Sequence, residues 1–191
     1  FVTTEWLAAH LSAPDLMIVD ASWHLPTAGR DAQADYLAAH IPGAVFFDID
    51  AIRDKTTDLP HMLPDPVAFS SAMRRLGLGD GMRVVVYDSH GLFSAPRVWW
   101  TLRAYGVREA FVLEGGLPAW IAAGHGVDDG PALMRPRHFT ARLDHGAVAN
   151  LEDVRKALTG VAQVVDARAA DRFAGEAPEP RSWVKPGRVP G

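Results

Sequence analysis

The apolar residues of the first 125 positions follow two different patterns. Short runs rich in Val and Ile, such as 84–87, are typical of strands buried on both faces. Apolar residues spaced as on one face of a helix lie between Val67 and Leu76, with Asp65-Pro66 as start signals and Gly77 as a stop signal. The patterns predict strands over 16–19, 45–47, 84–87 and 110–113, and helices over 4–11, 32–40, 66–76, 95–105 and 117–123.

The alternation of short strands and helices predicts an α/β fold with a mainly parallel sheet covered on both faces. Residues 126–146 break the pattern, because they are rich in Gly, Pro and charged residues and show little periodicity. We therefore expect one complete domain over 1–125, a connector over 126–146 that runs across the surface, and a second domain that begins at 147.

The second part of the chain repeats features of the first. Val164-Val165-Asp166-Ala167 resembles Ile18-Val19-Asp20-Ala21, and Arg188-Val189-Pro190-Gly191 resembles His40-Ile41-Pro42-Gly43, at offsets of 146 and 148 residues. Asn150 is placed to cap a helix that reaches Leu158. This duplication predicts two copies of one α/β domain, with residues 147–191 as an incomplete second copy that continues beyond Gly191.

The segment from Val84 to Trp100 joins a buried strand, a tight loop and a helix. Such a loop collects backbone N–H groups at a helix N-terminus, which is an anion-binding arrangement. Asp88 stands where the strand ends, and Gly91 lies in the loop. Two interpretations of Asp88 are open: it caps the turn that follows, as Asp often does, or it takes part in chemistry.

Composition excludes several classes of function. The net charge of −4 and the scattered basic residues give no support for nucleic-acid or membrane-surface partners. No apolar run approaches the roughly 18 residues of a membrane span, and no signal-peptide pattern is present, so we expect a cytoplasmic protein. The histidines lack metal-ligand spacing, and we predict neither metal nor cofactor. The chain has no cysteine, which excludes a cysteine nucleophile within these residues.

Several motifs in order resemble the tandem-domain sulfurtransferases of the rhodanese family, most closely the 3-mercaptopyruvate branch. They include Val19 to Trp23, His40 to Ala44, His61 to Pro64, Ser94 to Trp100 and Gly175 to Arg181. The resemblance implies a three-layer rhodanese-like domain. It also implies that the first domain is catalytically silent, with Asp88 where the second domain carries its nucleophilic cysteine.

The resemblance further implies a reaction and its site residues. A sulfane sulfur passes from 3-mercaptopyruvate through a cysteine persulfide to a thiophilic acceptor such as cyanide, a small thiol or thioredoxin. That cysteine is expected beyond Gly191, so the chain alone is predicted to be inactive. Arg172 and Arg181 match arginines that bind the donor's carboxylate and carbonyl, while Asp50 and His61 match a proton-relaying pair.

Other interpretations of the same residues are open. The donor could be thiosulfate, or the chain could be a cysteine-free, non-catalytic rhodanese-like module that binds or regulates a partner. A phosphatase on the same fold would also need a cysteine and leaves the two arginines unexplained. Arg172 and Arg181 could be ordinary surface residues, and His61 could be a loop histidine near a capping Asp50.

Overall fold

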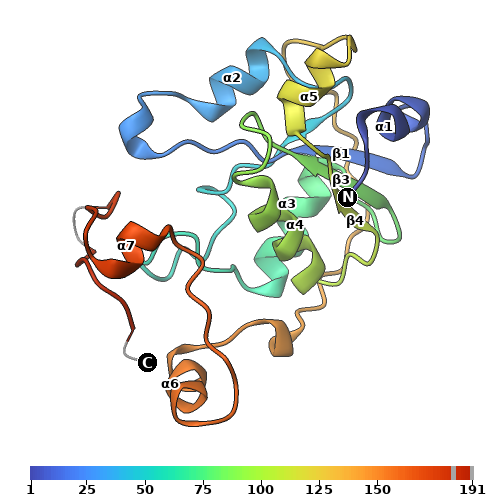
Figure 1. Ribbon diagram of the computed structural model, residues 1–191. Helices are drawn as coiled ribbons and strands as arrows, with labels where there is room; N and C mark the ends of the chain where they lie inside the picture. The colour runs from blue at the N-terminus through green and yellow to red at the C-terminus, as the bar shows by residue number, and fades with distance from the viewer. Residues whose placement is uncertain (182–183, 190–191) are drawn as a thin grey trace. The chain divides into compact units, whose positions relative to one another are not determined.

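The computed structural model describes residues 1–181 and 184–189. It contains two compact units, Phe1–Asp144 and His145–Gly191 (Figure 1). No helix among the described residues has the length and apolarity needed to cross a lipid bilayer.

The first unit is built on a four-stranded parallel sheet in the order β2-β1-β3-β4. Its strands are β1 (Leu16–Asp20), β2 (Val45–Phe46), β3 (Arg83–Tyr87) and β4 (Ala110–Val112). The register places Val19 beside Val45 on one side and Val86 on the other. The predicted α/β fold with a parallel sheet is therefore confirmed, and all four predicted strands are present.

Five helices of this unit also match the predicted positions: α1 (Thr4–His10), α2 (Ala32–Ala38), α3 (Pro66–Leu76), α4 (Ala95–Ala104) and α5 (Gly116–Ala122). The two ends of α3 follow the expected chemistry. The Asp65 carboxylate accepts hydrogen bonds from the backbone N–H groups of Val67 and Ala68, and Gly77 ends α3 in a left-handed conformation. A short 3₁₀ helix, η1 (Pro26–Ala28), precedes α2.

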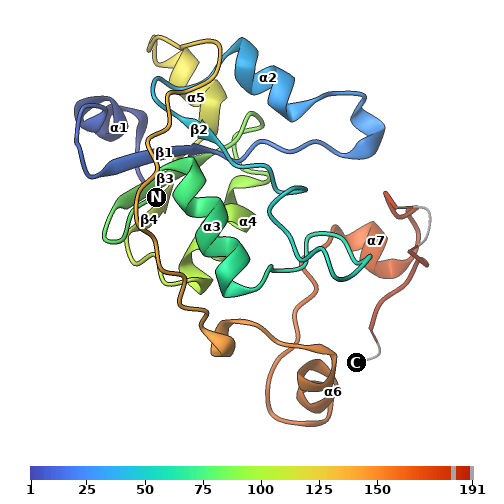
Figure 2. The same ribbon diagram turned by 180° about the vertical axis from the view of Figure 1, so that it is seen from behind.

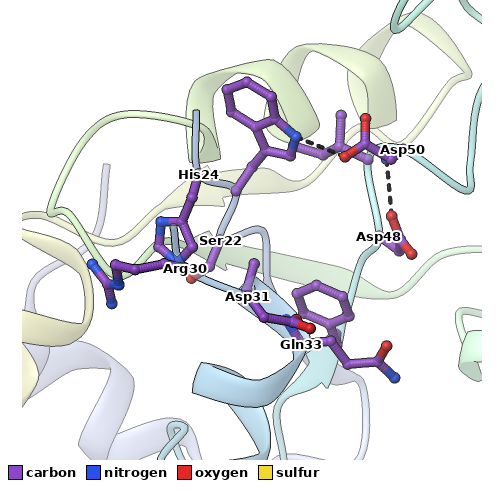
Figure 3. Close-up of a pocket in the computed structure, with 11 residues that line it drawn as sticks. Ser22, His24, Arg30, Asp31, Gln33, Asp48 and Asp50 are labelled. Carbon is purple, nitrogen blue, oxygen red and sulfur yellow. Dashed lines mark hydrogen bonds between the residues drawn. The ribbon is translucent and has the colours of Figure 1, made fainter. Parts of the chain in front are cut away.

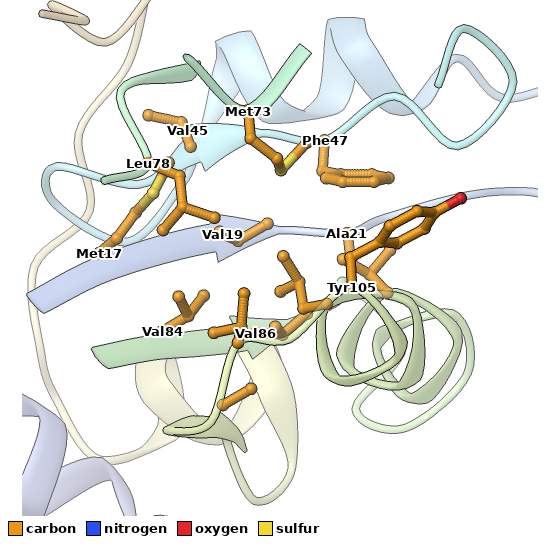
Figure 4. Close-up of a cluster of buried hydrophobic side chains, with 14 of the residues drawn as sticks. Met17, Val19, Ala21, Val45, Phe47, Met73, Leu78, Val84, Val86 and Tyr105 are labelled. Atoms are coloured by element: carbon orange, nitrogen blue, oxygen red, sulfur yellow. The ribbon is translucent and has the colours of Figure 1, made fainter. Parts of the chain in front are cut away.

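Helices lie on both faces of the sheet (Figures 1 and 2), and alternate residues of the central strands belong to two different buried clusters. Met17, Val19, Val84 and Val86 pack with residues of α3 and α4, as Figure 4 shows for part of this cluster. The intervening residues pack against α1 and α5: Ile18, Val85 and Tyr87 lie in one buried cluster with Leu7 and Trp120. Both faces of the sheet are thus buried, which explains the continuous apolar runs in the sequence.

Residues 126–144 belong to the first unit and are more than a connector on its surface. Phe139 is only 3% exposed and packs in the core beside Phe69. Its carbonyl accepts a hydrogen bond of 3.1 Å from Arg74 Nε, and the Ala141 N–H donates to Ser70 Oγ at 2.9 Å. A single buried aromatic among polar neighbours gives no periodic signal, so the sequence pattern misses this packing.

The second unit holds η2 (His145–Ala147), α6 (Leu151–Thr159) and α7 (Ala170–Ala174). The predicted Asn150 cap is confirmed, as part of a capping box with Asp153. Residues 164–167 form no strand, and Val165 is 82% exposed, because the described part of this unit offers no strand to pair with. The predicted repeat at 188–191 lies partly outside the described residues.

Candidate functional site

The loop after β3 is filled by the side chain of Asp88, which is completely buried. One carboxylate oxygen accepts a hydrogen bond from the His90 N–H at 2.9 Å. The other accepts three, from the N–H groups of Phe93, Ser94 and Ala95, at 2.7 to 2.9 Å. The donors that such a loop could offer to a bound anion are therefore occupied by the protein's own carboxylate.

Close packing fixes this loop from outside. The Asp88 carbonyl accepts a hydrogen bond from the Leu117 N–H at 3.0 Å, and Ser22 Oγ accepts one from the Ser89 N–H at 2.9 Å. Gly116 has a positive φ of 55°, and a Cβ there would come within 2.4 Å of the Asp88 carbonyl oxygen. Glycine is thus required where the start of α5 meets the loop.

Asp20, at the end of β1, is a second buried carboxylate under the same edge of the sheet. It accepts a hydrogen bond from the Ser22 N–H at 2.8 Å. Burial raises the pKa of Asp20, and hydrogen bonds from Ser22 and Tyr87 offset part of that rise. Asp20 stands in the repeated Ile18–Ala21 segment, but the sequence pattern does not report that its side chain is buried.

Asp50 and His61 meet directly, although eleven residues separate them. His61 Nε2 lies 2.8 Å from Asp50 Oδ1. The other oxygen, Asp50 Oδ2, accepts a hydrogen bond of 2.8 Å from the Trp23 indole N–H. Figure 3 shows this bond and the 2.9 Å bond from the Asp50 N–H to Asp48 that holds the turn. The carboxylate is therefore oriented from two sides.

His61 is held as firmly as its partner. Its backbone is left-handed, with φ 58°, which is uncommon outside glycine. Arg97 Nη2 donates to the His61 carbonyl, and the Trp23 ring meets the imidazole edge-on at 5.2 Å. The His61 side chain is 20% exposed and that of Asp50 is 64% exposed. The Asp50 carboxylate thus fixes the orientation of the His61 ring, as carboxylates do for histidines that act as general acids or bases.

Asp50 also lines a pocket of about 310 Å³ (Figure 3). Its polar lining carries three carboxylates against one guanidinium, that of Arg30. An excess of negative charge disfavours an anionic sulfur donor here. No cluster of three metal-ligating side chains occurs among the residues that the structure describes. The three carboxylates that line the pocket belong to Asp31, Asp48 and Asp50.

The second unit gathers positive charge around one buried carboxylate. The Glu179 side chain is 4% exposed and pairs with both Arg168 and Arg172. Arg168 also forms a bidentate pair with Asp166, from Nε to Oδ1 and from Nη2 to Oδ2, and donates to the Gly187 carbonyl at 2.8 Å. The neighbouring guanidinium of Arg168 lowers the pKa of Asp166 to about 2.

Arg181 follows Glu179 closely along the chain, and its backbone carbonyl accepts a hydrogen bond from the Val184 N–H at 3.0 Å. Of the residues predicted from sequence, Asp50 and His61 are thus brought together in the first unit, while Arg172 and Arg181 lie within the second. Trp23, Arg168 and Glu179 were not assigned roles. Trp23 and Glu179 lie within the motifs Val19–Trp23 and Gly175–Arg181, and the position of Glu179 between two prolines is the one sequence signal that marks it.

The four-stranded parallel sheet and the loop at its carboxyl edge are those of a rhodanese-like domain. Residues 3–123 match the Rhodanese-like domain family, and the chain belongs to that family. It is 43% identical over its whole length to the 3-mercaptopyruvate sulfurtransferases of Homo sapiens and Escherichia coli, and covers 66% and 69% of them.

Further similarity extends to the thiosulfate sulfurtransferase of Bos taurus, at 41% identity over 94% of this chain and 62% of that protein. The structure superposes on the crystal structure of SseA from Escherichia coli with a TM-score of 0.92, at 41% identity, covering all of this chain and 72% of SseA. The chain therefore spans about two thirds of the length of the curated relatives that it matches.

Proposed function

We propose that the chain is the donor-binding part of a sulfurtransferase that takes sulfur from 3-mercaptopyruvate and delivers it to a thiophilic acceptor. The observation that carries this proposal is the guanidinium of Arg172, held in a built ion-pair network. Two guanidinium groups, those of Arg172 and Arg181, suit a donor that presents a planar carboxylate beside a ketone. The relatives named 3-mercaptopyruvate sulfurtransferase support the same assignment.

The proposed chemistry proceeds in two steps. A cysteine thiolate attacks the sulfur of 3-mercaptopyruvate, the bond between that sulfur and carbon 3 breaks, and the electron pair leaves on carbon as the enolate of pyruvate. A proton then converts the enolate to pyruvate, while the enzyme retains a cysteine persulfide. An acceptor thiolate or cyanide attacks the outer sulfur in the second step and releases the cysteine.

His61 is proposed to supply or relay the proton, with Asp50 fixing the orientation of its ring. The nucleophile is proposed to lie beyond Gly191, because the 191 residues contain no cysteine. Asp88, where the first-domain loop would hold one, cannot carry sulfane sulfur, since a carboxylate lacks a polarisable sulfur atom. We accordingly assign Asp88 a structural role.

The acceptor is proposed to be a small thiol, a thioredoxin-like protein or cyanide, in the cytoplasm. The bovine thiosulfate sulfurtransferase among the relatives makes thiosulfate the competing donor. The alternative of a non-catalytic binding module remains distinguishable by activity alone, because such a module turns over no donor.

The test uses the protein with the polypeptide that continues beyond Gly191. Purified enzyme is supplied with 3-mercaptopyruvate or thiosulfate, and both pyruvate release and the mass of the enzyme are followed. We expect pyruvate with 3-mercaptopyruvate, a mass gain of one sulfur atom on a cysteine, and a higher kcat/KM than with thiosulfate. Absence of turnover with either donor would favour the binding module, and a preference for thiosulfate would contradict the donor assignment.

A further inference from the structure

We infer that Glu179 is a positioning residue for the sulfur donor, acting by holding the Arg172 guanidinium in one orientation. This inference rests on the proposed function, because it concerns how Arg172 meets the donor's carboxylate. It adds to the donor site a residue that does not itself contact the donor.

The Glu179 side chain is removed almost completely from solvent, at 4% exposed. A carboxylate removed from water is costly unless both oxygens are paired. Here Oε1 accepts from Arg168 Nη1 at 2.7 Å, and Oε2 accepts from Arg172 Nε at 3.1 Å and from Arg172 Nη2.

The contacts of Arg172 leave one side of its guanidinium uncommitted. Glu179 takes the Nε–H and one N–H of Nη2. Nη1 has no partner among the residues that the structure describes, and the side chain is 31% exposed. A donor carboxylate can therefore bind the outer N–H groups of Nη1 and Nη2 together, in the planar geometry that guanidinium favours.

Glu179 is itself anchored, so it can transmit an orientation. Pro178 and Pro180 flank it and restrict the backbone on both sides. Arg168, on its other oxygen, is fixed by the bidentate pair with Asp166 and by the Gly187 carbonyl. Negative and positive side chains thus alternate along one series of ion pairs, and each pair restrains the orientation of its two members. The series runs through Asp166, Arg168, Glu179 and Arg172.

The direction in which KM changes when Glu179 is neutralised distinguishes two ways in which this residue could act. If Glu179 acted only through its field, its negative charge would weaken the binding of any anion, and neutralising it would lower KM. If it acts by orientation, neutralising it releases the Arg172 fork and raises KM despite the gain in positive charge. The effect should be larger for 3-mercaptopyruvate, which needs a planar clamp, than for compact thiosulfate.

The experiment compares Glu179→Gln with Glu176→Gln, an exposed glutamate three residues earlier on the same segment, in the protein with its continuation beyond Gly191. For Glu179→Gln we expect KM for 3-mercaptopyruvate to rise about tenfold, with kcat within about threefold of wild type. Glu176→Gln should leave both constants unchanged. An unchanged or lower KM in Glu179→Gln would overturn the inference, and inactive wild-type enzyme would instead overturn the proposed function.

A double-mutant cycle with Arg172→Ala separates positioning from general support of the fold. Once the guanidinium is removed, Glu179→Gln should add no further increase in KM. Independent, additive effects would show that Glu179 does not act through Arg172. If Glu179→Gln fails to fold, Glu179→Asp keeps the charge but shortens the reach, and it should show the same rise in KM; wild-type KM in that variant would also overturn the inference.

Discussion

The loop after β3 and the arginine network of the second unit each enclose a carboxylate, but they leave different groups available. Asp88 is surrounded by four backbone N–H donors of its own loop, which are all occupied by it. Glu179 pairs with two guanidinium groups, and Arg172 retains N–H groups on its outer side. Asp88 thus occupies the N–H donors of its own loop, whereas Arg172 still has N–H groups that can bind an anion.

This difference shows that an anion-binding loop does not identify an active site. Such a loop can bind a ligand only where its donors remain unoccupied, and in the first unit a side chain of the same loop occupies them.

The largest effect is expected on stability from Asp88→Ala. The substitution leaves four N–H groups of a buried loop without their acceptor, and we expect a loss of at least about 3 kcal/mol in the free energy of unfolding. Chemical denaturation measures it, with the exposed Asp58→Ala as the control. A loss below about 1 kcal/mol would show that water replaces the carboxylate without difficulty.

Asp88→Asn, which keeps an acceptor oxygen, should leave turnover of the active protein within a few-fold of the wild-type value.

The next largest effect is expected from His61→Ala in the active protein. Loss of a general acid or base lowers kcat on the order of a hundredfold with little change in KM. His138→Ala, which removes an exposed imidazole elsewhere in the same unit, is the matched control. Unchanged kcat and an unchanged pH profile in His61→Ala would reduce His61 to a structural loop residue.

Arg181→Ala tests the donor side. Removing a charge-assisted contact should lower kcat/KM for 3-mercaptopyruvate by about ten- to a hundredfold, and that for thiosulfate much less. Arg155→Ala, on the exposed face of α6, controls for the loss of positive charge. An equal loss with both donors would mean that Arg181 supports the fold rather than selecting the donor.

Trp23→Phe should have a smaller effect. It keeps the aromatic contact with His61 but removes the indole N–H that binds Asp50 Oδ2. Because Asp50 is largely exposed, the lost bond should be worth about 1 kcal/mol, or a three- to tenfold lower kcat. Steady-state kinetics against pH would detect it, and wild-type kcat would show that the Asp48 turn suffices to hold Asp50.

The smallest effect concerns acid stability. The pKa of Asp166 is lowered from 3.8 to about 2 by Arg168, so the stability that this pair contributes is present above pH 3.8 and is lost as the pH falls toward 2. The raised pKa of Asp20 has the opposite sign, because protonation of that buried acid favours the folded state. Unfolding of wild type and Asp166→Asn should differ near neutral pH and converge in acid; a constant difference would contradict the pairing.

The sequence predicted the elements of the first unit well because their signals are local. Val84 to Tyr87 forms a continuous apolar run, and Asp65, Pro66 and Gly77 mark the two ends of α3. Phe139 and Glu179 escaped prediction for a different reason. Their burial depends on partners distant in sequence or on side-chain geometry, which periodicity does not report.

The candidate site shows the same division. Family motifs pointed to Asp50, His61, Arg172 and Arg181, but not to the groups that orient them. The indole of Trp23, the carbonyl contact of Arg97 and the carboxylate of Glu179 emerge only once the chain is folded. Short helix α7 was likewise missed, since five residues carry too little periodicity to be recognised.

One measurement tests most directly that the carboxylate-filled loop carries no sulfur. A polypeptide of these 191 residues and the protein with its continuation are each incubated with 3-mercaptopyruvate, and pyruvate release is followed together with peptide masses. We predict no pyruvate and no added sulfur for the 191 residues, and turnover with a persulfide on a cysteine beyond Gly191 for the longer protein. Pyruvate release by the 191 residues alone would contradict this assignment.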